Sequence, residues 1–523
     1  MSILICALYF VVLFILSSYG LHRLHLVLLC RRNRARIEAV TEVHDERGVA
    51  FTPMSDDELP VVTIQLPLFN ESTVVERLLE AVAEMDYPKD RLQIQVLDDS
   101  TDETRSIAAR KVDELCARGH DAIYVHRTDR VGYKAGALDH GLATAKGDLI
   151  GIFDADFIPR PDFARSLVEH FRDPSVGMVQ ARWAHLNRSA SLLTRVQALM
   201  LDGHHLVENR ARYGAELFFN FSGTGGMWRR QAIQDAGGWQ HDTLTEDLDL
   251  SYRAQLAGWR FVYRPDVVSP AELPEDISAL RAQQYRWAKG TVQTARKLLR
   301  RIASSDLSLK QRIEALFHLT PHFAYPLMLA LCLLLLPVLA TVEASDWKMA
   351  LLFDLPLCMA PISSLASFYM LAESAQGRSR WEALKVLPAL IGLGAGLAPH
   401  LTAAVADGLR NRAGEFVRTP KRGSNRFRYK ARVQLPFAEL LFTLICAGSV
   451  VMSLRAGHYF ATPFATLFTF GFGYVAYLVI VEAAQRDRAE RALEAAEAVP
   501  VASGTRRKGE AQVLPSPSAD VAA

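Results

Sequence analysis

The stretch GIFDADFIP, residues 151–159, decides the fold of this chain. The apolar run 149–153 has the length of a buried strand, and it ends in two aspartates, Asp154 and Asp156. Removing carboxylates from water costs free energy, and residues i and i+2 of a strand point the same way. The pair therefore predicts a site for Mg²⁺ or Mn²⁺, which prefer oxygen ligands. The alternative is two solvated aspartates that cap the helix following at PRPDF.

Strand-like and helix-like segments alternate before and around this stretch. Such alternation predicts an α/β, Rossmann-like domain with a mostly parallel sheet covered by helices on both faces. Ligands of such sheets bind at the carboxyl ends of the strands, where FNE (69–71), DDS (98–100) and DAD (154–156) fall. The expected strands are 61–67, 92–97, 122–126 and 149–153, and the expected helices are 72–85, 103–117 and 134–145.

The segment TLTEDLDLSYRAQLAG, residues 243–258, has the pattern of a helix with acids in its first turn. Asp247 lies in that turn, where the helix dipole favours its ionised form. An ionised carboxylate can take a proton from a hydroxyl, so Asp247 is a candidate general base. Glu246 and Asp249 compete for the role, and ordinary enrichment of acids in a first turn is the simpler alternative.

A second motif, QQYRWAKG at 283–290, lies in a helical pattern that places Gln283, Arg286 and Trp287 on one face. A guanidinium can bind a phosphate with two hydrogen bonds, and an indole offers an apolar plane to a sugar ring. The alternative is an amphipathic helix with a half-buried Trp. Lys134 follows a glycine at an expected helix start, which is a favourable place for an anion.

Apolar residues make up 50% of the 523-residue chain, but they are unevenly spread. Residues 61–310 have the composition of a soluble domain, whereas 313–483 have that of a membrane region. The apolar stretch 3–19 is followed by several arginines, which predicts a retained anchor; a cleaved signal is the alternative. Further segments long enough to span a bilayer are 322–342, 349–372, 435–454 and 459–481.

The loop 410–432 contains nine Lys and Arg and one acid, so we expect it on the cytosolic side. With the preceding soluble domain also inside, the segment 382–407 fits best as an interfacial or re-entrant segment, because a full crossing would invert the pattern. This gives five crossings, with six as the alternative. The tail 484–523 is charged and then rich in Pro, Ser and Ala, which predicts disorder beyond a short helix.

Taken in order, the motifs FNE, DDS, KAG, DAD, GTGG, TED and QQYRW resemble those of membrane-embedded processive glycosyltransferases of family 2, most closely the cellulose synthase-like mannan and glucan synthases. The resemblance covers about residues 60–425. It implies an N-terminal transmembrane helix (1–30), a cytosolic linker (31–60), a GT-A glycosyltransferase domain (61–275), interface helices (276–312) and a transmembrane bundle (313–483).

The stretch EFVRTPKRG, 415–423, resembles the gating loop of bacterial cellulose synthase, although Arg418 stands where a valine is expected. The resemblance also implies roles for individual residues. Phe69, Glu71 and Asp99 would line the nucleoside pocket; Lys134, Asp154, Gln283 and Arg286 would bind the donor; Asp154 and Asp156 would bind the metal; Asp247 would be the catalytic base; Trp287 would contact the acceptor; and Phe416, Thr419 and Lys421 would form the gating loop.

The resemblance implies an inverting hexosyltransferase that uses UDP-glucose or GDP-mannose and Mg²⁺ or Mn²⁺ to extend a β-glucan or β-mannan, coupled to translocation. Its partners would be the donor, the polysaccharide and the bilayer, and no nucleic acid. It would be an integral protein of a plasma, inner or Golgi membrane with its catalytic domain in the cytosol. Alternatives are a transferase with a lipid acceptor and an inactive glycan-binding scaffold.

Overall fold

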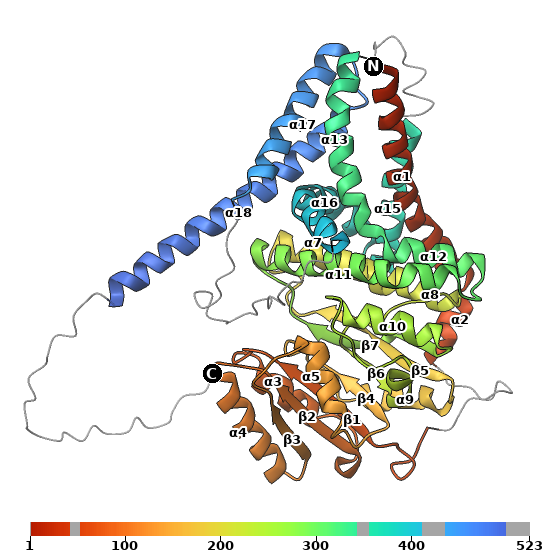
Figure 1. Ribbon diagram of the computed structural model, residues 1–523, viewed down its shortest axis with the longest axis vertical. Helices are drawn as coiled ribbons and strands as arrows, with labels where there is room; N and C mark the ends of the chain where they lie inside the picture. The colour runs from red at the N-terminus through yellow and green to blue at the C-terminus, as the bar shows by residue number, and fades with distance from the viewer. Residues whose placement is uncertain (1, 42–52, 342–354, 411–434, 498–523) are drawn as a thin grey trace, which may run out of the picture.

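The computed structural model describes residues 2–41, 53–341, 355–410 and 435–497. An α/β domain lies at one end of the molecule, and long apolar helices rise from it (Figure 1). The first strands and helices alternate as expected from the sequence. They are β1 (Val62–Leu68), α3 (Val75–Ala83), β2 (Leu92–Asp98), α4 (Thr104–Ala117), β3 (Asp121–His126), α5 (Tyr133–Leu142) and β4 (Leu149–Ile152).

The sheet has seven strands in the order β3-β2-β1-β4-β6-β5-β7. Strands β2 and β4 both pair in parallel with β1, so the strand order reverses between β1 and β4. Ligands of open α/β sheets bind at such a reversal, outside the carboxyl ends of the strands. FNE, DDS and DAD follow β1, β2 and β4, respectively, and therefore lie at this edge.

The second half of the sheet contains elements that the sequence patterns did not predict. The strand β6 (Gly226–Arg229) runs antiparallel to both β4 and β5 (Val176–His185), whereas β7 (Arg260–Ala271) pairs in parallel with β5. The sheet is thus mixed but mostly parallel, in agreement with the predicted fold class. Short helices join these strands: α6 (Phe163–Val168), α7 (Leu192–Gly203), the π-helix η4 (His204–Glu208), α8 (Asn209–Gly214) and α9 (Arg230–Asp235).

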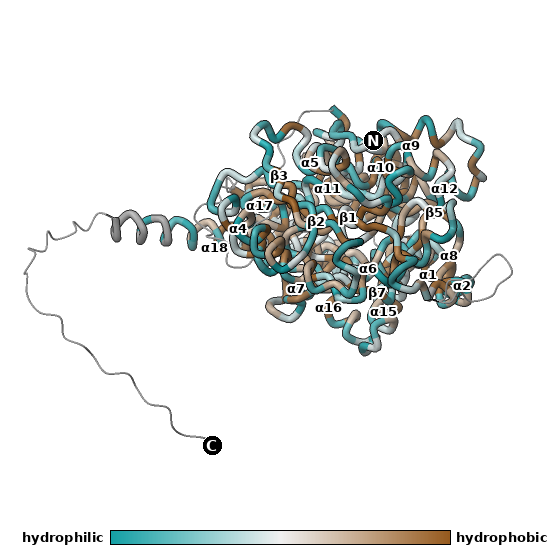
Figure 2. Tube along the Cα trace, turned by 90° about the horizontal axis from the view of Figure 1, so that it is seen from below, coloured by the Kyte–Doolittle hydropathy of each residue, from teal (hydrophilic) through white to brown (hydrophobic). Residues whose placement is uncertain are grey.

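Alternate residues of the strands fill two separate cores. Val62, Ile64 and Leu66 of β1 pack with α3, α4 and α6 on one face. Ile150 and Ile152 of β4 pack with α5, α9 and α10 (Glu246–Leu256) on the other. Since successive side chains of a strand point to opposite faces, both faces of the sheet are covered by helices, as the alternating sequence pattern predicts. Viewed from below, hydrophilic segments surround the hydrophobic strands of this domain (Figure 2).

Two helices lie between the sheet and the apolar helices: α11 (Ile277–Ala303) and α12 (Leu309–Leu319). The QQYRW motif is in the first half of α11, as its helical pattern predicts. A core of buried side chains joins α11, α7 and α8 to the apolar helices α1 (Ser2–Arg32), α15 (Leu355–Ser374) and α16 (Arg380–Leu409). The α/β domain and the apolar helices therefore share a packed interface.

Within the described residues, five helices are long and apolar enough to cross a membrane: Ile3–Arg32, Pro321–Thr341, Arg380–Leu409, Phe437–Ala456 and Thr462–Arg488. They contain α1, α13 (Ala324–Thr341), α16, α17 (Phe437–Ala456) and most of α18 (Thr462–Glu497). Large apolar side chains such as Phe14, Leu444 and Phe470 are more than half exposed, which suits contact with lipid. Of the expected segment 349–372, only residues from 355 are described, and α15 is not among the five.

The helix α16 corresponds to the segment 382–407, for which we expected an interfacial position. Just before it, Arg378 donates a hydrogen bond to Asp202 of α7 (2.9 Å). At its other end, Arg296 of α11 donates to the carbonyl of Gly408 (3.1 Å). A crossing helix would have its ends separated by the ~30 Å hydrocarbon layer, but α16 contacts α7 of the α/β domain next to one end and the helix α11 at the other. This placement fits an in-plane helix, and the number of crossings stays a prediction.

The last helix, α18, packs against α16 and α17 along its first half and then projects away from the rest of the described chain (Figures 1 and 2). Contact with α16 is close because both helices carry glycines there: a Cβ atom on Gly396 would lie 2.3 Å from the carbonyl oxygen of Gly471. The small residues that interrupt the apolar pattern of 382–407 thus allow helix packing.

Candidate active site

One cavity opens at the carboxyl edge of the sheet, between the α/β domain and α11. Its walls come from the ends of β1, β2, β4 and β5, the first turns of α5 and α10, and one face of α11. All predicted site residues of the described chain line it: Phe69, Glu71, Asp99, Lys134, Asp154, Asp156, Asp247, Gln283, Arg286 and Trp287. The three predicted gating-loop residues, Phe416, Thr419 and Lys421, lie outside the described residues.

Lys134 connects three segments of the cavity wall. Its ammonium group is 2.5 Å from Oδ1 of Asp154 and donates a hydrogen bond to the carbonyl of Gly223 (2.9 Å). Burial alone would lower the pKa of Lys134, but Asp154 and Glu246 raise it above its usual range. Lys134 is therefore a fixed positive charge at the end of β4, in the position of an anion-binding residue.

Asp247 lies on the other side of the same glycine turn. A Cβ atom on Gly223 would be 3.1 Å from Oδ2 of Asp247, so the turn and the carboxyl group are in near contact. Oδ1 of Asp247 accepts a hydrogen bond from the backbone amide of Leu248 (2.8 Å). Burial and the neighbouring Glu246 raise the pKa of Asp247 to about 7. The helix dipole favours ionisation, as expected from the sequence, but burial and a like charge outweigh it.

The structure separates the three acids that compete for the role of base. Asp249 is fully buried and forms ion pairs with Arg253 (2.8 Å) and Lys297 (3.0 Å), away from the cavity. Glu246 and Asp247 both line the cavity. Because Asp249 is paired and inaccessible, it stabilises the fold of α10. The base is therefore either Glu246 or Asp247.

The helix α11 is held against the first turn of α10. The side-chain oxygen of Gln293 accepts a hydrogen bond from the amide of Leu244 (3.0 Å). A Cβ atom on Gly290 would lie 2.6 Å from Cγ2 of Thr245, so only a glycine allows this approach. The QQYRW face and the TED turn are thereby fixed side by side at the cavity, a relation that their separation in sequence does not reveal.

The opposite end of the cavity is formed by the loops after β1 and β2. Arg127 binds both carboxylate oxygens of Asp99 (2.8 and 2.6 Å). The guanidinium of Arg130 lies 3.3 Å from the ring centre of Phe69 and 5.0 Å from that of Tyr133. Arg130 and Tyr133 also line the cavity, although no sequence motif indicated them. Their signal would have been a basic and an aromatic residue next to Lys134 at a helix start.

Asp154 and Asp156 are suited to a divalent cation by their chemistry. Both carboxyl groups line the cavity at the end of β4. Among the described residues, no group of three or more His, Cys, Asp or Glu side chains could hold a metal ion. A cation here would thus take few protein ligands and complete its shell with water or phosphate oxygens, as Mg²⁺ does in phosphate-binding sites.

The sequence has recognisable relatives. Residues 60–290 match the family described as "Glycosyltransferase like family 2". The chain is 41% identical over 268 residues to glucomannan 4-beta-mannosyltransferase 2 of Arabidopsis thaliana, which is 49% of this chain and 50% of that protein. It is 41% identical over 266 residues to a probable glucomannan 4-beta-mannosyltransferase 7 of Oryza sativa subsp. japonica, covering 50% of this chain and 46% of that protein.

The match over residues 60–290 is to the glycosyltransferases of family 2. The similarity of the chain to the cellulose synthase-like mannosyltransferases is the one that the motif series predicts. The chain spans about half the length of these curated relatives.

A solved structure supports the fold. A mannosyltransferase from Pyrobaculum calidifontis, in complex with GDP-Man and Mn²⁺, aligns with a TM-score of 0.50 at 22% identity, over 76% of this chain and 100% of that one. This likeness shows the GT-A-like arrangement of the sheet, which agrees with the predicted fold class.

Proposed function

We propose that this chain is an inverting, nucleotide-sugar-dependent hexosyltransferase that extends a β-linked mannan backbone. Support comes from the 41% identity to glucomannan 4-beta-mannosyltransferases over half of the chain. The observation that carries the proposal is the convergence, in one cavity, of two aspartates at a strand end and an acid of raised pKa. A glycan-binding scaffold has no need of such an acid.

Asp247 serves as the base in this proposal. Its carboxylate takes the proton from the acceptor hydroxyl while the hydroxyl oxygen attacks the anomeric carbon of the donor. A pKa of about 7 makes it a stronger base than an ordinary aspartate near neutral pH. A single displacement converts an α-linked donor into a β-glycoside.

The donor diphosphate binds between the end of β4 and α11. Lys134 is a fixed cation next to Asp154, and Arg286 lines the cavity opposite. Asp154 and Asp156 would hold Mg²⁺ or Mn²⁺, which supplies positive charge to the departing diphosphate. Phe69, Glu71 and Asp99 form the nucleoside end, Gln283 contacts the pyrophosphate, and Trp287 offers its plane to the acceptor sugar.

The apolar helices would place this reaction at a membrane. Since α11 contacts α16 and α18, and the cavity-lining helix α7 contacts α15 and α16, a growing chain that leaves the site would meet the apolar helices. The basic residues of 410–432 place the α/β domain on the cytosolic side in this proposal. Coupling to translocation and a role for 410–432 as a gating loop rest on the family resemblance.

A donor panel tests the function. Purified membranes containing the full chain are supplied with GDP-mannose, UDP-glucose or UDP-N-acetylglucosamine and with Mg²⁺, Mn²⁺ or EDTA. We expect incorporation of mannose, with or without glucose, into alkali-insoluble β-1,4-linked polymer, and loss of incorporation with EDTA. A chloroform-soluble labelled product would identify a lipid acceptor instead, and no product with any donor would overturn the assignment as a transferase.

A further inference from the structure

Two aromatic side chains of β5 line the cavity without a role in the motif series. Trp183 and His185 are separated by one residue, so they point to the same side of the strand. Both line the cavity, as does Leu201 of α7. The strand β5 is separated from β4 by β6, so these side chains lie on the far side of the candidate metal ligands from the loops after β1 and β2.

The indole of Trp183 is fixed next to the reacting centre. Its Nε1 donates a hydrogen bond to the carbonyl of Thr224 (3.2 Å). The hydroxyl of the same threonine accepts a hydrogen bond from the amide of Asp154 (2.9 Å). The preceding residue, Gly223, is in near contact with Asp247. One short turn therefore connects the indole to the candidate metal ligand and to the candidate base.

The imidazole of His185 is oriented by a buried carboxylate. Its Nε2 is 3.2 Å from Oδ1 of Asp202, whose side chain is 1% exposed. Burial raises the pKa of Asp202, but His185, Gln376 and Arg188 outweigh burial and lower it. An ionised carboxylate can only accept hydrogen bonds. Nε2 of His185 therefore donates to this carboxylate, and in the neutral imidazole Nδ1 then carries the lone pair.

No protein group of the described chain bonds to Nδ1 of His185, and this atom is not among the fully buried unpaired polar atoms. The side chain is 5% exposed and lines the cavity. A hydrogen-bond acceptor beside an indole plane suits a sugar residue, which offers hydroxyl donors on its edge and C–H groups on its face. It does not suit a phosphate, which offers no donor when ionised.

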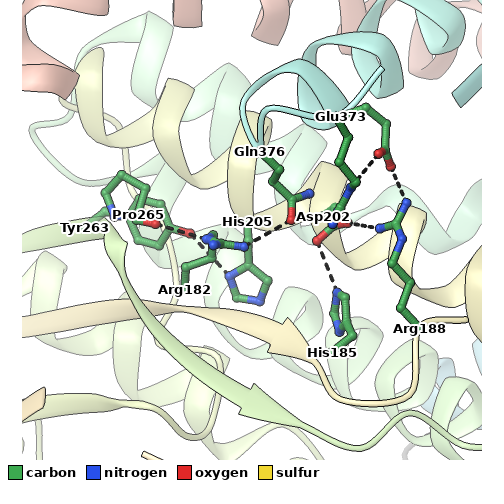
Figure 3. A network of polar contacts seen from close by, with 10 residues as sticks. Arg182, His185, Arg188, Asp202, His205, Tyr263, Pro265, Glu373 and Gln376 are labelled. Carbon is green, nitrogen blue, oxygen red and sulfur yellow. Dashed lines mark hydrogen bonds and ion pairs between the residues drawn. The ribbon is translucent and has the colours of Figure 1, made fainter. Parts of the chain in front are cut away.

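The carboxylate that orients His185 is itself held by the junction between α15 and α16 (Figure 3). Asp202 also accepts hydrogen bonds from Arg188 (2.6 Å) and Arg378 (2.9 Å). Both of these arginines bind Glu373, which is fully buried at the end of α15. The His185 side of the cavity therefore faces the apolar helices, whereas the nucleoside loops face away from them.

We propose that Trp183 and His185 form a subsite for a sugar residue of the acceptor chain, in which Nδ1 of His185 accepts a hydrogen bond from a sugar hydroxyl. The subsite deepens the proposed function and rests on it for the identity of the chain that binds. His185 is a specificity-determining residue here, and Asp202 is a positioning residue that fixes its tautomer.

Direct binding tests the subsite separately from turnover. The full chain in lipid nanodiscs is titrated calorimetrically with β-1,4-mannotetraose, without a donor, and in parallel with GDP-mannose and UDP-glucose. His185→Phe keeps a ring and removes the acceptor atom; we expect about a five- to tenfold higher Kd for the tetraose, the worth of one hydrogen bond. His185→Asn, which places Oδ1 close to the position of Nδ1, is expected to stay within about threefold of the wild type.

The matched control is His140→Phe, which places the same substitution on an exposed histidine of α5 outside the cavity. It should bind tetraose and donors as the wild type does, and His185→Phe should change donor Kd less than twofold. Equal tetraose affinity in His185→Phe and wild type, or no tetraose binding by the wild type, overturns the subsite. Tetraose binding that depends on His185 in a protein that turns over no donor supports the subsite and overturns the proposed transferase.

Discussion

Two regions of this molecule hold buried acids whose pKa values move in opposite directions. In the cavity, burial together with the like charge of Glu246 raises the pKa of Asp247 to about 7. Beneath α1, burial also acts on Glu314 of α12, but His22 and Arg212 lower its pKa to about 2. Burial is common to both regions, so the number of cationic partners decides which acid is held ionised and which is ready to exchange a proton.

The region beneath α1 is a closed set of ion pairs. Glu314 contacts His22 (2.8 Å) and Arg212 (3.1 Å), and Glu208 contacts Arg212 (3.1 Å) and Arg23. These pairs join the first apolar helix to the α/β domain and to the π-helix η4. The acids beneath α1 therefore stabilise the packing of α1 on the α/β domain, whereas those of the cavity are suited to chemistry.

The largest expected effect comes from removing the proposed base. Asp247→Asn keeps the size of the side chain and cannot take a proton, so we expect turnover to fall by about 10²–10⁴-fold. Donor affinity should change little, because the proposed phosphate ligands are untouched. The measurement is initial rate with GDP-mannose beside calorimetric binding of the same donor.

The control for this variant is Asp113→Asn, an exposed position of α4 outside the cavity. It should leave both quantities unchanged. Turnover of Asp247→Asn within a factor of ten of the wild type would move the role of base to Glu246, the other acid that faces the cavity.

Breaking the ion pairs beneath α1 should lower the stability of the protein and leave its turnover unchanged. Glu314→Gln leaves Arg212 with one carboxylate fewer, and such losses in buried pairs cost about 3–5 kcal/mol. We expect a clearly lower thermal midpoint in detergent at pH 7. The surface variant Glu38→Gln, which loses an exposed pair with Arg34, should cost less than about 1 kcal/mol.

The pH dependence gives a further check on Glu314. Because its pKa is lowered in the folded protein, its stabilisation is complete above the unfolded pKa of 4.5 and is lost as the pH falls towards about 2. The difference in thermal midpoint between wild type and Glu314→Gln should therefore shrink between pH 5 and pH 3. A difference that does not depend on pH would exclude the ion pairs as its cause.

Much of the first half of the fold could be predicted from sequence, because its strands are short apolar runs separated by amphipathic helices. The second half could not. The strand β7 contains Pro265 and Pro270, and the second half of β5 mixes Arg182 and His185 with apolar residues. Pairing between β5 and β7 includes register irregularities, which no local pattern indicates.

The same contrast holds for the site. Residues in named motifs could be found because each lies directly after a strand, in the first turn of a helix, or on one face of the helical pattern 283–290. Trp183 and His185 carry no motif, and only the sheet order brings them to the cavity. The raised pKa of Asp247 also needs the fold, since the helix dipole by itself predicts the opposite direction.

Two glycines allow the effect of backbone strain to be separated from the effect of contact with Asp247. Gly223 and Gly258 both have positive φ values, +83° and +97°, so alanine costs about 1–2 kcal/mol of backbone strain at each. Only at Gly223 would the new Cβ atom approach Asp247, at 3.1 Å from Oδ2. We expect Gly223→Ala to lose roughly tenfold or more in turnover, since small displacements of reacting groups are costly.

Gly258→Ala, with nothing within 4 Å of its Cβ position, should lower the thermal midpoint by a similar amount and keep its turnover. Rates measured on both variants well below their thermal midpoints separate the two effects. Equal loss of turnover in both would mean that strain, and not contact with Asp247, limits the first variant.

The smallest expected effect is the pH profile that follows from Asp247. A base must be ionised, so kcat/KM at low donor concentration, which reports the free enzyme, should fall as the pH drops through about 7. Glu246 contributes to the raised pKa by its like charge. Glu246→Gln should therefore move the acidic limb of the profile to lower pH and raise the relative rate at pH 6 by a few-fold. If the acidic limb of kcat/KM stays at the same pH in Glu246→Gln, the charge of Glu246 does not raise the pKa of Asp247. The difference between Asp247 and the paired Glu314 would then not be explained by neighbouring charges.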